Sequence, residues 1–219
     1  ENNVERVIFT SSDKAVNPTS VMGTSKLMGE RLISAANSMK MNHRTIFSST
    51  RFGNVIGSRG SVVPIFYRQI KEGGPITLTD SNMTRFVMTI EESARLVLQA
   101  AELAKGGEVF VTKMVVIRIK DLAEAMIEMI TGKADSVEIK EIGPKPGEKL
   151  YEELMTDEET GRALELEEMF SVLPAFRHVY EDIDYSYPNV VTENVDDPYV
   201  SSNSTPLNIE EIKSYLIEH

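Results

Sequence analysis

One acid and two amines follow a short apolar run near the start of the chain. Ser12, Asp13 and Lys14 come just after Val-Ile-Phe, and Lys26 lies four residues beyond Met22. Residues four apart share a helix face, so Met22 and Lys26 should point into the same space. Ligands of open α/β sheets bind at the ends of the strands. We therefore expect these side chains to converge on one small molecule and to move protons on it.

The same residues resemble a known enzyme superfamily. Extended short-chain dehydrogenases/reductases carry Ser or Thr at a strand end and then Tyr-x-x-x-Lys, and this chain has Met22 at the Tyr position. The segment Ser-Ser-Asp-Lys-Ala-Val-Asn-Pro-Thr is similar to the CapD-like nucleotide-sugar 4,6-dehydratases, which act on UDP-N-acetylglucosamine and some of which have Met there. The resemblance covers roughly residues 4–155, through Arg-Phe-Gly-Asn-Val-Ile-Gly-Ser-Arg-Gly-Ser-Val, Thr-Arg-Phe and Pro-Gly-Glu-Lys-Leu.

The resemblance implies a lyase of polysaccharide biosynthesis that uses NADP, with NAD as the alternative. The sugar is oxidised at C4, water is eliminated across C5 and C6, and hydride returns to C6 to give a UDP-4-keto-6-deoxy sugar. Asp13 and Lys14 would form the elimination pair, and Ser12 would hydrogen-bond the C4 oxygen. A free lysine, with a pKa of about 10.4, acts as a base at neutral pH only after burial or beside another cation. Which member of the pair takes which proton stays open, as does a surface ion pair without chemistry.

Met22 and Lys26 would complete the catalytic set. A thioether cannot accept a proton at neutral pH, so another group must replace the Tyr phenol. The resemblance assigns Lys26 to the nicotinamide ribose and places Ser11, Phe52 and Asn54 beside the cofactor. The ordinary alternatives are a core methionine and a solvated lysine.

A second set of residues would bind the substrate. The resemblance assigns to it Asn54, Arg59, Ser61, Val62, Pro64, Arg85 and Glu148. Arginine makes directional bidentate contacts with phosphate, and helix N-termini favour phosphate, so Arg85 and the start of a helix at 62–71 would hold the diphosphate. The alternatives are a turn asparagine, a strand-edge arginine and a solvated glutamate.

Apolar periodicity predicts an α/β fold. The predicted strands are 6–11, 45–52, 76–79, 85–89, 108–112 and 137–142, and the predicted helices are 21–39, 62–71, 90–104, 119–130 and 208–217. The resemblance implies a Rossmann-like parallel sheet with a smaller mixed α/β substrate-binding domain. Residues 1–55 would be the C-terminal part of the dinucleotide-binding domain, 56–155 an interleaved substrate-binding region and 156–219 a partly irregular extension.

Two finer predictions concern the faces of these elements. The inward face of helix 21–39 is predicted to carry apolar residues. They are Leu27, Leu32, Ala35, Ala36 and Met39. The acidic residues at 152–153 and 157–159 are predicted to form a solvated face without chemistry.

The chain contains no Gly-x-Gly-x-x-Gly fingerprint. In the family, the fingerprint and the first strands precede the Asp-Lys segment, so we expect this chain to be the C-terminal part of a longer protein. Without them the sheet would have an unpaired edge, and the cofactor would lack its glycine cradle. This motivates an alternative outside catalysis, a module that binds nucleotide sugar or drives assembly. A second alternative is a nucleotide-sugar 4-epimerase, which needs no elimination pair.

Composition narrows the class of protein. A net charge of −11 over 219 residues argues against a nucleic-acid surface, and no apolar run is long enough to cross a bilayer. Cysteine is absent, and His43, His178 and His219 lack metal-ligand spacing, so no metal site is predicted. These features fit a cytoplasmic enzyme that acts on a UDP-sugar, and the resemblance implies a homo-oligomer.

Overall fold

The computed structural model describes residues 3–39, 45–58, 60–144, 146–176, 180 and 182–218. The chain forms two compact units, each built from three separate stretches. The first unit contains Glu1–Phe52, Glu91–Lys113 and Glu153–Val200, and the second contains Gly53–Ile90, Met114–Glu152 and Ser201–His219. Their boundaries differ from the predicted ones at residues 55/56 and 155/156, since β-strands at 109–112, 163–166, 169–172 and 190–192 belong to the sheet of the first unit.

The first unit is organised around one sheet of six strands. Their order is β1 (Arg6–Ser12), β2 (Ile46–Phe52), β6 (Val109–Thr112), β11 (Met169–Val172), β10 (Ala163–Leu166) and β12 (Val190–Thr192). Strands β1, β2 and β6 are parallel, which confirms the predicted α/β class with a parallel sheet. The remaining strands continue it in antiparallel pairing and were not predicted. Strand β1 is first in this order, so it is less buried than an interior strand.

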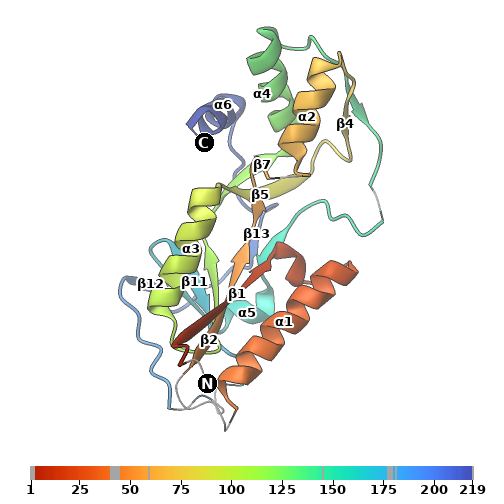
Figure 1. The fold of residues 1–219 in the computed structure, drawn as a ribbon. Coiled ribbons are helices and arrows are strands. Elements are labelled where there is room, and N and C mark those ends of the chain that lie inside the picture. Colours follow the sequence, from red (N-terminus) through yellow and green to blue (C-terminus); the bar gives the residue numbers. More distant parts are fainter. Residues whose placement is uncertain are drawn as a thin grey trace. The chain divides into compact units, whose positions relative to one another are not determined.

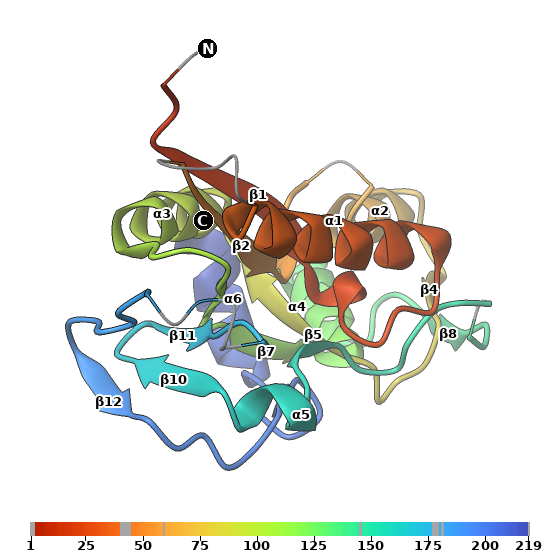
Figure 2. The same cartoon turned by 90° about the horizontal axis from the view of Figure 1, so that it is seen from below.

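A 3-10 turn, three helices and a sheet of two strands complete the first unit. A 3-10 turn, η1 (Asp13–Ala15), follows β1, and α1 (Val21–Asn37) then lies along β1 and β2 (Figures 1 and 2). Helix α3 (Ile90–Leu103) precedes β6, and α5 (Asp157–Thr160) lies between β9 (Glu153–Met155) and β10. Strand β9 pairs with β13 (Tyr199–Val200).

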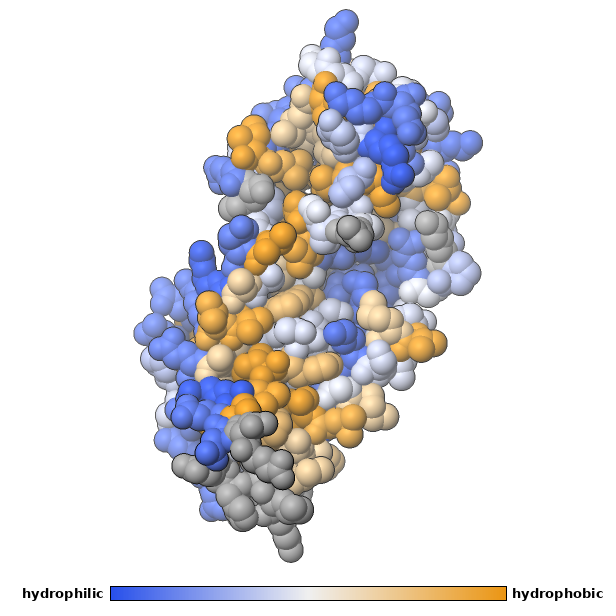
Figure 3. All heavy atoms as spheres, viewed as in Figure 1, coloured by the Kyte–Doolittle hydropathy of each residue, from blue (hydrophilic) through white to orange (hydrophobic). Residues whose placement is uncertain are grey.

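The orientation of α1 differs from the prediction. Gly23 and Glu30 are its buried residues, whereas Leu32 is 61% exposed and Ala35 and Met39 are also exposed. In the space-filling view, apolar side chains gather on the surface over this helix (Figure 3). Three residues of the predicted apolar face are therefore exposed, whereas Leu27 and Ala36 are half-buried, and the fully buried positions of α1 are a glycine and a carboxylate.

Two glycines allow α1 to approach β1 closely. A Cβ at Gly23 would lie 2.2 Å from the Lys14 carbonyl oxygen, and one at Gly29 would lie 2.3 Å from the Phe9 ring. Ser20 caps the helix by accepting a hydrogen bond from the Gly23 N–H at 3.1 Å. The first turn of α1 is thus seated directly on the turn that carries Asp13 and Lys14.

A buried arginine links α1 to the sheet and to α5. Arg51 in β2 donates its Nε and Nη2 to the two Glu30 oxygens, at 3.0 and 2.9 Å. Its Nη1 and Nη2 donate to the two Glu159 oxygens at 2.8 Å each, and Nη1 also donates to the Leu154 carbonyl at 2.8 Å. A guanidinium has five N–H groups, so all of them are satisfied. Glu159, predicted to be solvated, is buried here, which corrects that prediction.

The second unit packs three helices around two small sheets. Strands β3 (Asn54–Val55), β5 (Thr84–Met88) and β7 (Val115–Arg118) form one sheet, and β4 (Ile76–Leu78) pairs in parallel with β8 (Ile139–Glu141). Helix α2 (Val62–Lys71) has its predicted bounds, and α4 (Ile119–Thr131) packs between it and α6 (Ile209–Glu218). The core includes Phe66, Leu78, Met83, Ile117 and Leu122. Among the described residues, no helix has the length and apolar character needed to cross a membrane.

The arginine network predicts a specific loss of stability in acid. Burial raises the pKa of Glu159, but the hydrogen bonds and charge of Arg51 outweigh burial and lower the pKa from 4.5 to about 2. A folded-state pKa below the unfolded value stabilises the fold above about pH 4.5, and this contribution is lost as the pH falls toward 2. We expect Glu159→Gln to remove roughly 3 kcal/mol of this pH-dependent stability, measured by urea unfolding at neutral and acidic pH.

Glu158→Gln is the matched control, because the Glu158 side chain is 69% exposed. It should leave the pH dependence of the unfolding free energy close to that of the parent protein. Identical pH dependence in both variants would contradict the assignment to Glu159.

Candidate active site

The acid and the amine after β1 form a close ion pair. Ser12 caps η1 and accepts a hydrogen bond from the Lys14 N–H at 3.2 Å. Asp13 is 0% exposed, and its Oδ1 accepts bonds from the Lys14 N–H at 2.8 Å and from Lys14 Nζ at 2.9 Å. The Lys14 side chain is 37% exposed. Turn and ion pair together hold a carboxylate and an ammonium side by side at the end of the strand.

One oxygen of this carboxylate has no partner. Asp13 Oδ2 is buried and accepts no hydrogen bond from the described residues. A buried polar atom without a partner is costly, and such atoms in native proteins point to a functional role or a bound molecule. Oδ2 and the remaining Lys14 N–H groups are therefore the hydrogen-bonding positions of the pair that the described residues leave unused.

The first two turns of α1 carry the other predicted catalytic residues. Met22 lies in the first turn and is 48% exposed, so it is not a core methionine. Lys26 Nζ donates to the Thr10 carbonyl at 2.9 Å and lies 5.3 Å from the centre of the Phe9 ring. This lysine is anchored on β1, and its remaining N–H groups are available to a ligand.

The predicted cofactor residues fall in both units. Ser11 is buried in β1, where its Oγ has no hydrogen-bond partner among the residues that the structure describes, and Phe52 ends β2 opposite Ser12 in the strand register. Asn54 belongs to the second unit, where its Nδ2 donates to the Phe86 carbonyl at 3.2 Å. The first unit therefore brings together Ser11, Ser12, Asp13, Lys14 and Lys26, while Asn54 lines a cavity of the second.

The second unit contains a cavity of about 320 Å³. Its apolar wall includes Ile56, Phe66, Leu78, Met83 and Ile117. Polar groups at its lining include most of the predicted substrate residues. The polar ones are Asn54, Ser61, Arg85 and Glu148, with Thr77 and Thr79 added by the structure, and the predicted Val62 is part of the apolar lining. A mostly apolar cavity with a few convergent polar groups is typical of small-molecule sites.

The N-terminus of α2 borders this cavity. Ser61 occupies the capping position, yet its Oγ caps no backbone N–H and is buried without a partner among the described residues. The first N–H groups of a helix attract anions, and an uncapped hydroxyl adds a donor at the same place. Pro64, predicted to lie near the nucleotide, is exposed on α2 and does not line the cavity.

Arg85 is held by the segment that carries Glu148. Its Nη1 donates to the Thr84 and Leu150 carbonyls at 2.7 and 3.3 Å, and its Nη2 donates to the Lys149 carbonyl at 2.7 Å. Its Nε lies 3.6 Å from Glu152 Oε1. Within the described residues this leaves one Nη2 hydrogen for a ligand, so Arg85 would offer a phosphate a single donor in addition to its charge.

Glu148 and Glu152 occupy different environments. Glu148 is exposed at the cavity and accepts bonds from Thr79 Oγ1 at 3.2 and 3.1 Å. Glu152, predicted to be solvated, is buried beside Arg85, which corrects that prediction. The sequence signal for this burial is the apolar pair Leu154 and Met155, which lies between the two acidic runs and is fully buried.

Some predicted positions lie outside the described residues. These are Arg59 and the three histidines, His43, His178 and His219. Among the described residues, no group of His, Asp and Glu side chains could hold a metal ion.

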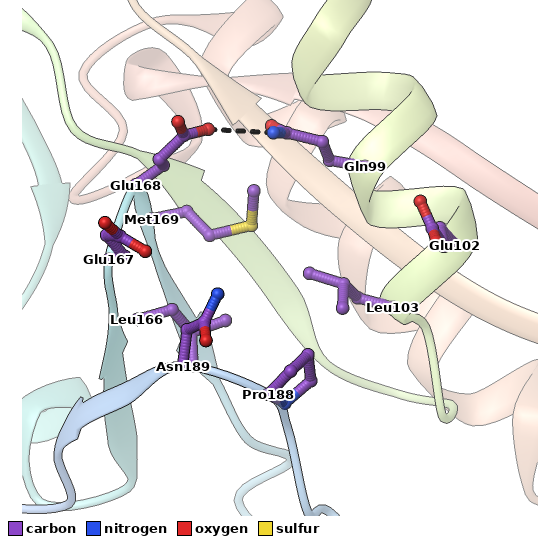
Figure 4. Close-up of a pocket in the computed structure, with 9 residues that line it drawn as sticks. All are labelled: Gln99, Glu102, Leu103, Leu166, Glu167, Glu168, Met169, Pro188 and Asn189. Atoms are coloured by element: carbon purple, nitrogen blue, oxygen red, sulfur yellow. Dashed lines mark hydrogen bonds between the residues drawn. The ribbon is translucent and has the colours of Figure 1, made fainter.

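The first unit has a cavity of about 320 Å³ that sequence reasoning did not anticipate. It lies between α3 and the turn joining β10 to β11, and Figure 4 shows Glu168 turned toward Gln99, whose Nε2 it binds at 2.8 Å. Glu102 and Glu167 also line it. Three carboxylates would repel an anionic ligand, so the cavity of the second unit is the better site for a nucleotide diphosphate.

The chain matches known proteins along most of its length. A family model described as polysaccharide biosynthesis protein matches residues 1–174. The chain is 49% identical over 160 residues to the Staphylococcus aureus capsular polysaccharide biosynthesis protein CapD, covering 73% of this chain and 26% of that protein.

Two further curated relatives are named for activities. Identity is 39% over 187 residues to a UDP-N-acetylglucosamine 4,6-dehydratase (inverting) of Campylobacter jejuni, covering 85% of this chain and 54% of that one. Identity is 38% over 220 residues to a UDP-glucose 4-epimerase of Rickettsia canadensis, covering 99% and 62%. These curated relatives are all longer than the chain, which spans less than two thirds of each.

A solved structure agrees with the fold of the whole chain. The X-ray structure of Pen from Bacillus thuringiensis superimposes with a TM-score of 0.87 at 42% identity, covering 99% of this chain and 63% of that one. The likeness extends over both units.

The contacts of Arg85 predict that it orders residues 146–152, the segment that brings Glu148 to the cavity. Arg85→Met removes the donors to the Lys149 and Leu150 carbonyls, so residues 146–152 should open more often. We expect amide hydrogen exchange in this segment to rise roughly tenfold, read by mass spectrometry of its peptides. Arg68→Met, on the exposed side of α2, should leave exchange there unchanged. Equal exchange in the two variants would mean that other contacts hold the segment.

Proposed function

Because the chain belongs to the polysaccharide biosynthesis protein family, the CapD-like extended short-chain dehydrogenases/reductases, we propose that it carries the catalytic pair of a UDP-N-acetylglucosamine 4,6-dehydratase. The observation that carries this proposal is the buried Asp13, with one oxygen paired to Lys14 and the other unpartnered. The name of the Campylobacter jejuni relative supports the reaction and the substrate. The product would be a UDP-4-keto-6-deoxy sugar.

The pair would perform the elimination. Once C4 is a ketone, the proton on C5 is acidic, and one member of the pair removes it. The other member gives a proton to the C6 hydroxyl, which leaves as water, so one C–H and one C–O bond break and a C5–C6 double bond forms. When a hydride reaches C6, a proton returns to C5 from the pair. The proton that leaves the C4 hydroxyl when C4 is oxidised would pass to the pair and replace the proton given to the C6 hydroxyl. Lys14 Nζ and Asp13 Oδ1 lie 2.9 Å apart, so a proton taken up by one can be shared with the other.

The residues of the first unit fit a nicotinamide dinucleotide. Lys26 has N–H groups left after its bond to Thr10, and Ser11 Oγ is a buried polar atom without a partner. Lys26 would hold the ribose hydroxyls and Ser11 the nicotinamide side, with Phe52 nearby. When bound, NADP, or NAD as the alternative, would accept the hydride from C4 and return it to C6. Met22 would pack against the sugar without taking a proton.

The second unit would bind the nucleotide part of the substrate. Ser61, the N-terminus of α2 and Arg85 supply donors and positive charge for a diphosphate. Asn54 would add an amide, and Glu148 would accept hydrogen bonds from the ribose. The apolar wall of the cavity would enclose the base. Arg59 stays a proposed substrate residue on the strength of the resemblance alone.

A nucleotide-sugar 4-epimerase is the second candidate, favoured by the name of the Rickettsia canadensis relative. It shares the oxidation at C4 but returns the hydride to C4. It needs no elimination, so an acid–amine pair would have no step to catalyse in it. The two functions therefore differ in their dependence on Lys14.

The full-length protein, incubated with NADP and UDP-N-acetylglucosamine, should yield a sugar nucleotide lighter by one water, detected by mass spectrometry. We expect Lys14→Ala to lower kcat by about 10²- to 10⁴-fold, the usual range for loss of an acid–base group. Lys71→Ala, on the exposed end of α2, is the control and should keep the parent rate.

Two results would overturn the dehydratase proposal. One is unchanged sugar or a C4 epimer as the sole product of the parent protein. The other is full activity after Lys14→Ala, which an epimerase would tolerate.

A further inference from the structure

Helix α1 is held against the sheet in an unusual way. Its buried residues are Gly23 and Glu30, with no large apolar side chain among them. Glycines set how closely a helix approaches its neighbour, but they do not define its rotation about its own axis. Near its C-terminal end, Ser34 Oγ donates to the Gly107 carbonyl at 2.9 Å and Asn37 Oδ1 accepts from the Phe47 N–H at 3.1 Å. The half of α1 that carries Met22 and Lys26 needs a further contact to fix its rotation.

Glu30 provides that contact. Both of its oxygens are bound by Arg51, through Nε at 3.0 Å and Nη2 at 2.9 Å, and both side chains are almost fully buried. A two-bond fork between planar groups defines orientation as well as distance. Since Arg51 belongs to β2 and has no N–H group left over, Glu30 can rotate away only by leaving a buried cation unsatisfied.

The position of Glu30 on α1 connects it with the site. Glu30 lies four residues after Lys26 and eight after Met22, so all three share one side of the helix. Lys26 reaches the Thr10 carbonyl from that side, and Gly23 seats the first turn on the Lys14 carbonyl. A small rotation of α1 would break the first contact and would displace Met22 from the Asp13–Lys14 turn.

We propose that Glu30, clamped by Arg51, is a positioning residue that sets the rotation of α1 and thereby the place of the Lys26 ammonium. The effect on turnover rests on the proposed dehydratase function. The effect on Lys26 itself does not, because it concerns the protein without ligands.

The other carboxylate on Arg51 provides a matched control. Glu159 accepts the same number of bonds from Arg51, is equally buried and lies on α5. Its further partners are Arg162 and the Thr156 N–H, which belong to the same short segment and not to α1. Glu30→Gln and Glu159→Gln therefore each remove one buried carboxylate charge that faces the Arg51 guanidinium. Only Glu30→Gln weakens a contact that holds α1.

The first measurement uses the full-length protein without ligands. Brief treatment with an amine-acylating reagent, followed by peptide mass spectrometry, reports how often the Lys26 amine leaves Thr10. We expect Glu30→Gln to raise the acylation rate of Lys26 about fivefold relative to the exposed Lys71, the factor given by one weakened hydrogen bond. Glu159→Gln should leave this ratio near the parent value.

The second measurement compares turnover with stability. Glu30→Gln should lower kcat and weaken NADP binding by about tenfold or more, with little change in the KM for UDP-N-acetylglucosamine, which would be bound by the second unit. Glu159→Gln should lower the melting temperature comparably and keep kcat. If Glu30→Gln fails to fold, Glu30→Asp keeps the charge with a shorter reach and should show the same selective effect on Lys26.

Equal Lys26 acylation in the Glu30 and Glu159 variants would overturn the proposal and leave the network a purely structural one. A parent protein without dehydratase activity would instead remove the proposed function, while the acylation result would still decide the role of Glu30.

Discussion

A single buried guanidinium links the parts of the first unit that matter for its chemistry. Arg51 lies in β2 and gives its five N–H groups to Glu30 on α1, to a carbonyl of β9 and to Glu159 on the short helix α5. Such a group is expensive to bury and is stable only while every partner stays in place. The sheet, α1 and α5 are therefore linked through one cation, and Glu30 is the partner that connects α1 to it.

Under the proposed function, the two units would have different tasks. The first presents an acid–amine pair at the end of β1 and a lysine anchored on the neighbouring helix. The second has an apolar cavity with an uncapped helix N-terminus and an arginine at its lining. In the first unit, Asp13 and Lys14 lie on the turn η1 and Lys26 on α1, whereas the predicted nucleotide contacts of the second unit come from strands β3 and β5, the start of α2 and the segment of Glu148.

Local patterns predicted much of this arrangement. The Asp-Lys pair and the Met-x-x-x-Lys spacing could be found because neighbours in sequence stay neighbours in a turn or on a helix face. The predicted inward face of α1 was wrong, since apolar spacing alone does not show that glycines and a carboxylate contact the sheet. Glu152 and Glu159 were taken as solvated, because their arginine partners lie 67 and 108 residues away. Strands β7 and β9 to β13 are too short to give a periodic signal.

The fate of a deuterium label at C4 of UDP-N-acetylglucosamine tests the central claim most directly. If the acid and amine at the end of β1 eliminate water, the label should reappear at C6 of the product, and C5 should take up hydrogen from the solvent. Nuclear magnetic resonance of the product distinguishes these positions. A label that stays at C4, with C5 unexchanged, would contradict the account.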